Sequence, residues 1–209
     1  MPSPIAHVGL AFFARPFLAR HPAAHALSRP RRWAFYALIS FALIAPDLDF
    51  ALAFIFTHPL HDHGTYMHSL FAAILFAPLF AFIAYPLLQR SIPRLTLALV
   101  GFAAYSSHLL LDLFTPGRGI MLAWPVTTER FASPVPLFFG AHHSQLWAFH
   151  LHLITLLTEL IFVALVGLTA HYLSPRPHQP PKQRPTSQRN SEFPSLPSTR
   201  NQKPKTRNP

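Results

Sequence analysis

The segment SSHLLLDLFTPGRG, residues 106–119, carries a histidine and an aspartate within otherwise apolar sequence. His108 and Asp112 are four residues apart, and positions i and i+4 lie on the same face of a helix. An imidazole and a carboxylate placed in this way either bind one cation together or form a buried ion pair with each other. Ionisable residues inside an apolar helix are costly and commonly have a function, so the pattern favours a pair of metal ligands.

A second group of acids lies in FALIAPDLDF, residues 41–50. Asp47 and Asp49 are about 200° apart on a regular helix, so they do not face one ion together unless the backbone is irregular. Pro46 lacks an N–H and can supply that irregularity. We expect Asp49 to be the metal ligand of the two. For Asp47 three roles remain open: a general base, a partner of a ligand, or a helix N-cap.

Histidines supply the third group, in HDHGTYMHS, residues 61–69. His63 and His68 are about 140° apart around a helix, so they converge only if His63 lies in a loop before the helix of His68. Gly64 makes such a loop accessible. His7, near the N-terminus, is a single histidine on an apolar segment and by itself fits a core position. Because the chain has no cysteine, a metal site must use imidazole and carboxylate, which suits zinc, with manganese or iron as alternatives.

These residues are carried by long apolar stretches. Of the 209 residues, 51% are hydrophobic and 11% are charged, and the mean hydropathy is +0.28, which is typical of a membrane protein. A bilayer is crossed by about 20 apolar residues. The shorter stretch Pro4–Ala19 is interrupted by Arg15 and Pro16. We therefore predict an all-α membrane helix bundle with a short N-terminal apolar helix and four long transmembrane helices, at residues 33–56, 67–88, 95–114 and 146–173.

The net charge of +10 is concentrated at the C-terminal end. Residues 174–209 hold eight Lys and Arg, one acidic residue and nine of the 23 prolines, with few large apolar residues. Such a segment cannot bury a core, so we predict a membrane-embedded domain at residues 1–173 and a disordered tail at 174–209. We expect the tail to contact anionic membrane lipids, and we expect no specific nucleic-acid partner. The oligomeric state is not predicted.

Positive charges predict the orientation of the spans. Arginines precede the first span, lie between the second and third, and follow the fourth with the tail, whereas residues 57–66 contain neither Lys nor Arg. By the positive-inside rule the tail is cytoplasmic, and residues 57–66 and 115–145 face the other side. All four aspartates then lie in the non-cytoplasmic half, namely Asp47, Asp49, Asp62 and Asp112. The pattern predicts a cleft of carboxylates and imidazoles near that membrane face.

Four segments together resemble a known family: PSPIAHVG, APDLDF, a His-x4-His-Ser element and HLLLDLFTPGRGIMLAWPV. Over residues 2–126 the chain is similar to the YdjM-like group of bacterial inner-membrane proteins, described as LexA-regulated, metal-dependent hydrolases. Where members of that group carry His-Arg-Gly-x-Thr-His-Ser, this chain has HGTYMHS at residues 63–69 and keeps both histidines and the serine. The resemblance implies location in the inner membrane and a divalent metal cofactor.

The residues and the resemblance together predict a membrane-bound metal-dependent hydrolase. Its substrate is expected to be a lipid-linked ester or phosphoester, because the site lies near a membrane face. Asp47 is the candidate base, and the metal ligands are His7, Asp49, His63, His68, His108 and Asp112. The alternative is a non-catalytic membrane protein, either a metal or proton carrier or a structural protein with a degenerate site. A carrier needs polar residues across the bilayer, whereas the other halves of the spans are nearly all Ala, Leu, Phe and Ile.

Overall fold

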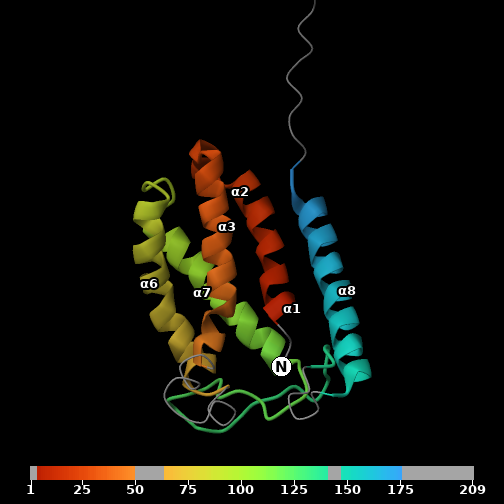
Figure 1. Ribbon diagram of the computed structural model, residues 1–209. Helices are drawn as coiled ribbons and strands as arrows, with labels where there is room; N and C mark the ends of the chain where they lie inside the picture. The colour runs from red at the N-terminus through yellow and green to blue at the C-terminus, as the bar shows by residue number, and fades with distance from the viewer. Residues whose placement is uncertain (1–3, 50–63, 141–146, 176–209) are drawn as a thin grey trace, which may run out of the picture. The chain divides into compact units, whose positions relative to one another are not determined.

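The computed structural model describes residues 4–49, 64–140 and 147–175 (Figure 1). Within these ranges the regular elements are helices, and the only pairing of strand type is one isolated antiparallel bridge between Ile120 and Phe131. The predicted all-α class is therefore confirmed. The predicted tail lies outside the described residues from residue 176 onward.

The N-terminal segment is helical but changes its winding along its length. It consists of α1 (Pro4–Gly9), the 3-10 helix η1 (Leu10–Phe13) and α2 (Ala14–Arg20). Pro16 lies in the first turn of α2, where its missing N–H is tolerated. The segment ends at His21, whose extended backbone is the conformation favoured before a proline. The predicted short N-terminal helix is thus present, and it packs against α3 and α8.

Proline also ends the next long helix. A short 3-10 helix, η2 (Pro22–Ala26), leads to α3 (Arg29–Ile44), which is followed by the 3-10 helix η3 (Ala45–Asp47). Pro46 cannot donate a backbone hydrogen bond, so the α-helical pattern stops just before it. The long span predicted at residues 33–56 is therefore not confirmed as one helix, and its part from residue 50 lies outside the described residues.

The other three predicted spans are present as long helices. The 3-10 helix η4 (Tyr66–His68) leads into α6 (Leu70–Leu87), which is followed by α7 (Arg94–Leu113) and later by α8 (Phe149–Leu173). Within the described parts of the chain, these three helices are long and apolar enough to cross a membrane.

Helices α6 and α7 pack closely along their length. Gly101 permits the close approach, because a Cβ at that position would lie 2.7 Å from the Phe80 ring. Side chains from α3, α6, α7 and the N-terminal segment form the main apolar core. This core fixes the angle at which α7 presents its C-terminal turns, where His108 and Asp112 lie.

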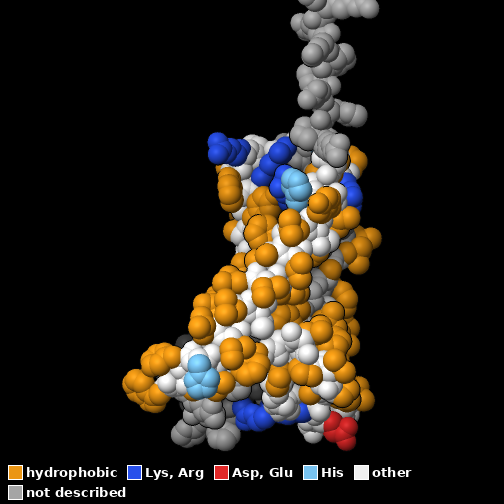
Figure 2. All heavy atoms as spheres, turned by 90° about the vertical axis from the view of Figure 1, so that its right-hand side faces the viewer, with side chains coloured by type: hydrophobic (Ala, Val, Ile, Leu, Met, Phe, Trp, Pro, Cys, Tyr) orange, Lys and Arg blue, Asp and Glu red, His pale blue; other side chains and the backbone are white. Residues whose placement is uncertain are grey.

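Large apolar side chains cover much of the outer surface. Examples are Phe82 on α6, which is 76% exposed, and Leu157 and Leu165 on α8. Figure 2 shows hydrophobic side chains in a band over the α8 side of the molecule, with Lys and Arg gathered at the two ends. An exposed apolar band between polar ends is the surface expected of a protein embedded in lipid.

The segment after α7 folds across the end of the bundle. Its bridge between Ile120 and Phe131 requires Gly119 at φ +72°, where a Cβ would collide with the Phe131 carbonyl oxygen. The same segment joins η4 and α6, since Met121 donates its N–H to the Gly64 carbonyl and Leu70 donates to Leu122. This arrangement fixes the loop of His68 against the C-terminal end of α7.

Candidate metal centre

Five ionisable side chains from four elements meet at the end of the bundle that the segment after α7 covers. His7 comes from α1, Asp47 from η3, His68 from η4, and His108 and Asp112 from α7. The side chains of the three histidines and of Asp112 are buried, whereas that of Asp47 is 29% exposed. The expected convergence of histidines and aspartates therefore occurs for these five residues. His63, another predicted ligand, lies outside the described residues.

Asp47 and Asp112 each direct one carboxylate oxygen toward the Nε2 atoms of His68 and His108. The Nε2 atoms of His68 and His108 are 3.4 Å apart. Oδ1 of Asp47 lies 3.6 Å from Nε2 of His68 and 3.4 Å from Nε2 of His108. Oδ2 of Asp112 lies 3.1 Å and 3.3 Å from the same two nitrogens.

The three distances among Nε2 of His68, Nε2 of His108 and Oδ2 of Asp112 match those between metal ligands. With zinc bonds of roughly 2.0–2.2 Å to imidazole nitrogen and carboxylate oxygen, the ligand atoms of a tetrahedral site are about 3.3–3.5 Å apart. The ligand atoms of His68, His108 and Asp112 are therefore spaced for one small divalent cation, and Asp47 lies beside the two histidines. We call these four residues the His/Asp cluster.

The outer nitrogens of both histidines are engaged by other groups. Nδ1 of His108 lies 2.6 Å from the carbonyl oxygen of Leu43, which can only accept, so Nδ1 carries the proton and donates it. Nδ1 of His68 lies 2.9 Å from Oδ2 of Asp49. Metal-binding histidines are commonly oriented in this way, with a carbonyl or carboxylate on the nitrogen that does not bind the metal. Both Nε2 atoms are thereby directed toward the centre.

Asp49 lies behind His68 and outside the cluster. Besides the His68 ring, its Oδ2 accepts a hydrogen bond from the Gly64 N–H at 3.2 Å. The sequence predicts that Asp49 is the metal ligand of the two aspartates. In the structure, the carboxylate of Asp47 faces the two Nε2 atoms instead. The short 3-10 helix at Pro46 turns the two side chains to different sides of His68.

Negative charge in the cluster requires compensation. Burial lowers the pKa of His68, but hydrogen bonds with Asp112, Asp47 and Asp49 outweigh it and hold the pKa well above its usual range. Both carboxylate oxygens of Asp112 are buried, and they face the ring nitrogens of His68, His108 and His7. Either a proton or a metal cation can neutralise this arrangement. The residues present therefore fit a divalent metal ion.

His7 adds a second, overlapping group. Its ring stacks on that of His108 with centroids 3.7 Å apart, and its Nε2 lies 3.6 Å from Oδ1 of Asp112. His7, His108 and Asp112 together could also hold a metal ion. Asp112 presents one oxygen to His68 and His108 and the other to His7, so its carboxylate would be a ligand in either group.

Tyr105 supports the centre and was not singled out from the sequence. Its hydroxyl donates to the carbonyl oxygen of Met67 at 2.6 Å and so holds η4 against α7. Tyr105, His108 and Asp112 have the spacing i, i+3, i+7 of one helix face, and this spacing could have indicated its role. The carbonyl of Leu43 has no comparable signal, because every residue carries one.

Comparison with known protein families identifies the family of this chain. The family described as YdjM inner membrane protein matches residues 3–177. The chain belongs to this family. The match includes every residue of the His/Asp cluster as well as His7, and the family description agrees with the apolar surface in placing the protein in the inner membrane. Searches of the curated proteins and of the solved structures gave no match.

Proposed function

We propose that the protein is a membrane-bound, metal-dependent hydrolase whose metal is held by His68, His108 and Asp112. The observation that carries the proposal is the spacing of the three ligand atoms, 3.1–3.4 Å, between Nε2 of His68, Nε2 of His108 and Oδ2 of Asp112. Two imidazoles and carboxylate oxygen suit zinc, with manganese or iron as alternatives. A divalent ion bound there would lower the pKa of a water molecule and polarise the bond to be cleaved.

Asp47 is proposed as the general base. It is the only one of the four cluster residues with an appreciably exposed side chain, so water and substrate reach the centre from its side. A carboxylate so close to the two Nε2 atoms is positioned to accept a proton from water at the centre. In this assignment Asp49 orients His68 by accepting its Nδ1 proton, and His7 stacks on His108 and limits its rotation.

The proposed substrate is a lipid-linked ester or phosphoester. The cluster lies at the C-terminal ends of α3 and α7, whereas Arg29, Arg31 and Arg32 lie at the start of α3 and Arg94 begins α7. By the positive-inside rule we propose that the cluster end faces the non-cytoplasmic side, with the tail cytoplasmic. A site at that level is accessible to lipid headgroups and their linkages.

A non-catalytic metal site is the second candidate. Four protein ligands that close a tetrahedron are typical of structural zinc, whereas catalytic zinc keeps one position for water. The two candidates differ in the role of Asp47, which is a ligand in the structural site and a base in the hydrolase.

Metal content and hydrolysis of the detergent-purified protein separate these candidates. The hydrolase predicts near-stoichiometric zinc, manganese or iron that is lost in His108→Ala and Asp112→Ala. It also predicts that Asp47→Asn keeps the metal and loses hydrolysis in a screen of phosphoesters and esters. His171→Ala, an exposed histidine on α8, is the control. Absence of metal from the parent after reconstitution contradicts both candidates, and loss of metal in Asp47→Asn favours the structural one.

A further inference from the structure

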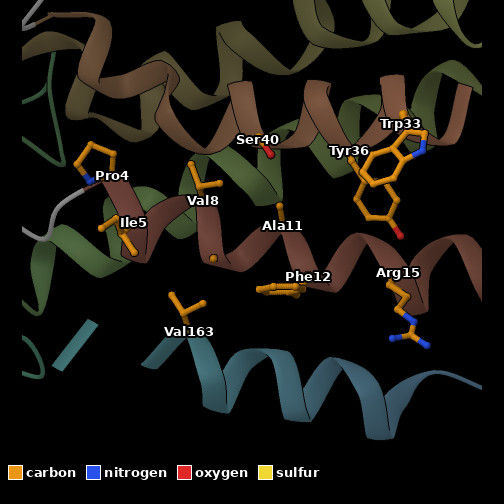
Figure 3. A pocket seen from close by; sticks show the side chains of 11 residues that line it. Pro4, Ile5, Val8, Ala11, Phe12, Arg15, Trp33, Tyr36, Ser40 and Val163 are labelled. Atoms are coloured by element: carbon orange, nitrogen blue, oxygen red, sulfur yellow. The ribbon is translucent and has the colours of Figure 1, made fainter. Parts of the chain in front are cut away.

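A long groove runs along the N-terminal helical segment. In Figure 3 this segment lies between α3 and α8, and the labelled side chains follow it from Pro4 to Arg15. The groove has a volume of about 870 Å³, within the range of sites that bind small organic molecules. None of its lining residues belongs to the His/Asp cluster.

The floor of the groove is one face of the N-terminal segment. Pro4, Val8, Ala11 and Arg15 line it with spacings of four, three and four residues, which place them on one side of a helix. His7 lies outside this stripe and contacts His108. Along the side of α8, Gly9 lets Val163 approach so closely that a Cβ on Gly9 would lie 2.5 Å from it. Apart from Ser40 on α3, the groove is therefore apolar until it reaches Arg15 (Figure 3).

The end of the groove at Arg15 is aromatic and positively charged. Tyr36 and Trp33, the latter 64% exposed, line the groove beside the guanidinium there. Trp and Tyr favour the level of lipid headgroups, and basic pockets between membrane helices bind anionic headgroups. Among the described residues Arg15 makes no ion pair, so its charge is available to a ligand.

We propose that this groove binds one anionic phospholipid. Its acyl chain lies along Val8, Ala11 and Phe12, and its phosphate lies at Arg15 beside Trp33 and Tyr36. Arg15 follows His7 by eight residues, about two helical turns, so the phosphate lies far from the His/Asp cluster. The bound lipid is therefore a ligand distinct from the substrate of the proposed hydrolase, and the two proposals are independent.

Charge and polarity favour a lipid over other occupants. A long apolar channel that ends at one cation is complementary to an acyl chain that ends at one phosphate. Residues 176–209 carry eight Lys and Arg and one acidic residue, so Arg15 repels them, and they contain few large apolar residues to fill the groove. A second copy of the chain remains an alternative occupant, and the experiment below distinguishes it.

Native mass spectrometry of the delipidated full-length protein tests the headgroup site. The protein is incubated in detergent with phosphatidylglycerol or with phosphatidylcholine of the same acyl chains. We expect one tightly bound lipid and a preference of about fivefold for phosphatidylglycerol, the effect of one basic residue near an anionic lipid. Arg15→Gln should remove the preference. Arg20→Gln, a matched change at the exposed end of α2 outside the groove, should keep it.

Three results would overturn the headgroup assignment. They are no preference in the parent, an unchanged preference in Arg15→Gln, and equal losses in Arg15→Gln and Arg20→Gln. The last result would show attraction to a basic surface in general. Because Arg15 is exposed, its substitution leaves the fold intact, and a thermal melt of each variant checks this.

A second pair of variants tests the acyl-chain site. Ala11→Phe fills the middle of the groove and should reduce lipid retention at least tenfold. Ala164→Phe, an exposed position on α8 outside the groove, should leave retention unchanged. Equal retention in both variants overturns the proposal. Light scattering that shows a dimer of the lipid-free parent, dissociated by Ala11→Phe, would assign the groove to a second copy of the chain and also overturn it.

Discussion

The two sides of the N-terminal segment show how one short helical stretch meets two different environments. On one side His7 is buried, stacks on His108 and faces the carboxylate of Asp112. On the other side Val8 and Phe12 are exposed along an apolar groove. A polar group inside a membrane protein needs a partner of opposite character, whereas an apolar side chain can face lipid directly. The position of His7 is therefore set by its contacts with other helices, whereas Val8 and Phe12 remain available to an apolar ligand.

The largest effect is expected for Asp112→Ala, which should abolish metal binding at the His/Asp cluster and leave lipid binding in the groove unchanged. Asp112→Ala deletes the carboxylate whose oxygens face both Nε2 atoms and His7, so metal affinity should fall at least a hundredfold. Competition with a fluorescent chelator measures the affinity. Phosphatidylglycerol binding should stay within twofold of the parent, and a parallel loss of lipid binding would show that the two sides are not independent.

A smaller loss is expected when the support of His68 is weakened. Asp49→Asn keeps the shape of the side chain but replaces the carboxylate that accepts the Nδ1 proton of His68. Partners of metal-binding histidines contribute about 10–100-fold to metal affinity, and a loss in this range is expected by the same titration. If Asp49→Asn loses metal as completely as Asp112→Ala, Asp49 is a ligand, as the sequence suggested.

Metal affinity at the His/Asp cluster should change about tenfold per pH unit, whereas lipid preference at the groove should not change with pH. The carboxylates raise the pKa of His68, so below that raised pKa the metal must displace a proton from the ring. Apparent metal affinity should therefore increase about tenfold for each unit of rising pH in this range, and level off above the pKa. Lipid preference should not change between pH 6 and 8, because no histidine and no acidic residue lines the groove among the described residues. A metal affinity independent of pH would argue against histidine ligands.

The smallest effect concerns the contact between α1 and α8. Gly9→Ala places a methyl group against Val163, and such overpacking costs about 1–3 kcal/mol of stability. Gly167→Ala is the matched control, since its Cβ would lie 3.9 Å from Phe12, an ordinary contact. Thermal melts in detergent should show a lower midpoint for Gly9→Ala alone. Equal midpoints would show that α8 does not pack against α1 as described.

Much of this arrangement could be predicted because it depends on local spacing. His108 and Asp112 share a face of α7 by helix geometry, and the stretch Pro4–Ala19 was expected to form a short helix. The orientation of Asp47 could not be predicted, because it depends on how the short 3-10 helix at Pro46 packs against η4. The approach of His7 to His108 is likewise set by tertiary packing.

For the groove, the sequence predicts the residues of one helix face but not whether other helices cover that face. The spacing of Pro4, Val8, Ala11 and Arg15 is visible in the sequence as one helix face. The sequence does not show that α3 and α8 leave this face uncovered, since that depends on where helices distant in the chain pack. The apolar face could therefore be predicted, and the binding site on it could not.

X-ray absorption at the metal edge of the purified protein tests the central claim most directly. We expect a first shell of about four nitrogen and oxygen neighbours at roughly 2.0–2.1 Å, with the outer-shell pattern of two imidazoles. His68→Ala and His108→Ala should each remove that pattern, whereas His171→Ala should retain it. A bound metal with no imidazole pattern, or a pattern unchanged in both cluster variants, would contradict the assignment of the His/Asp cluster as the metal centre.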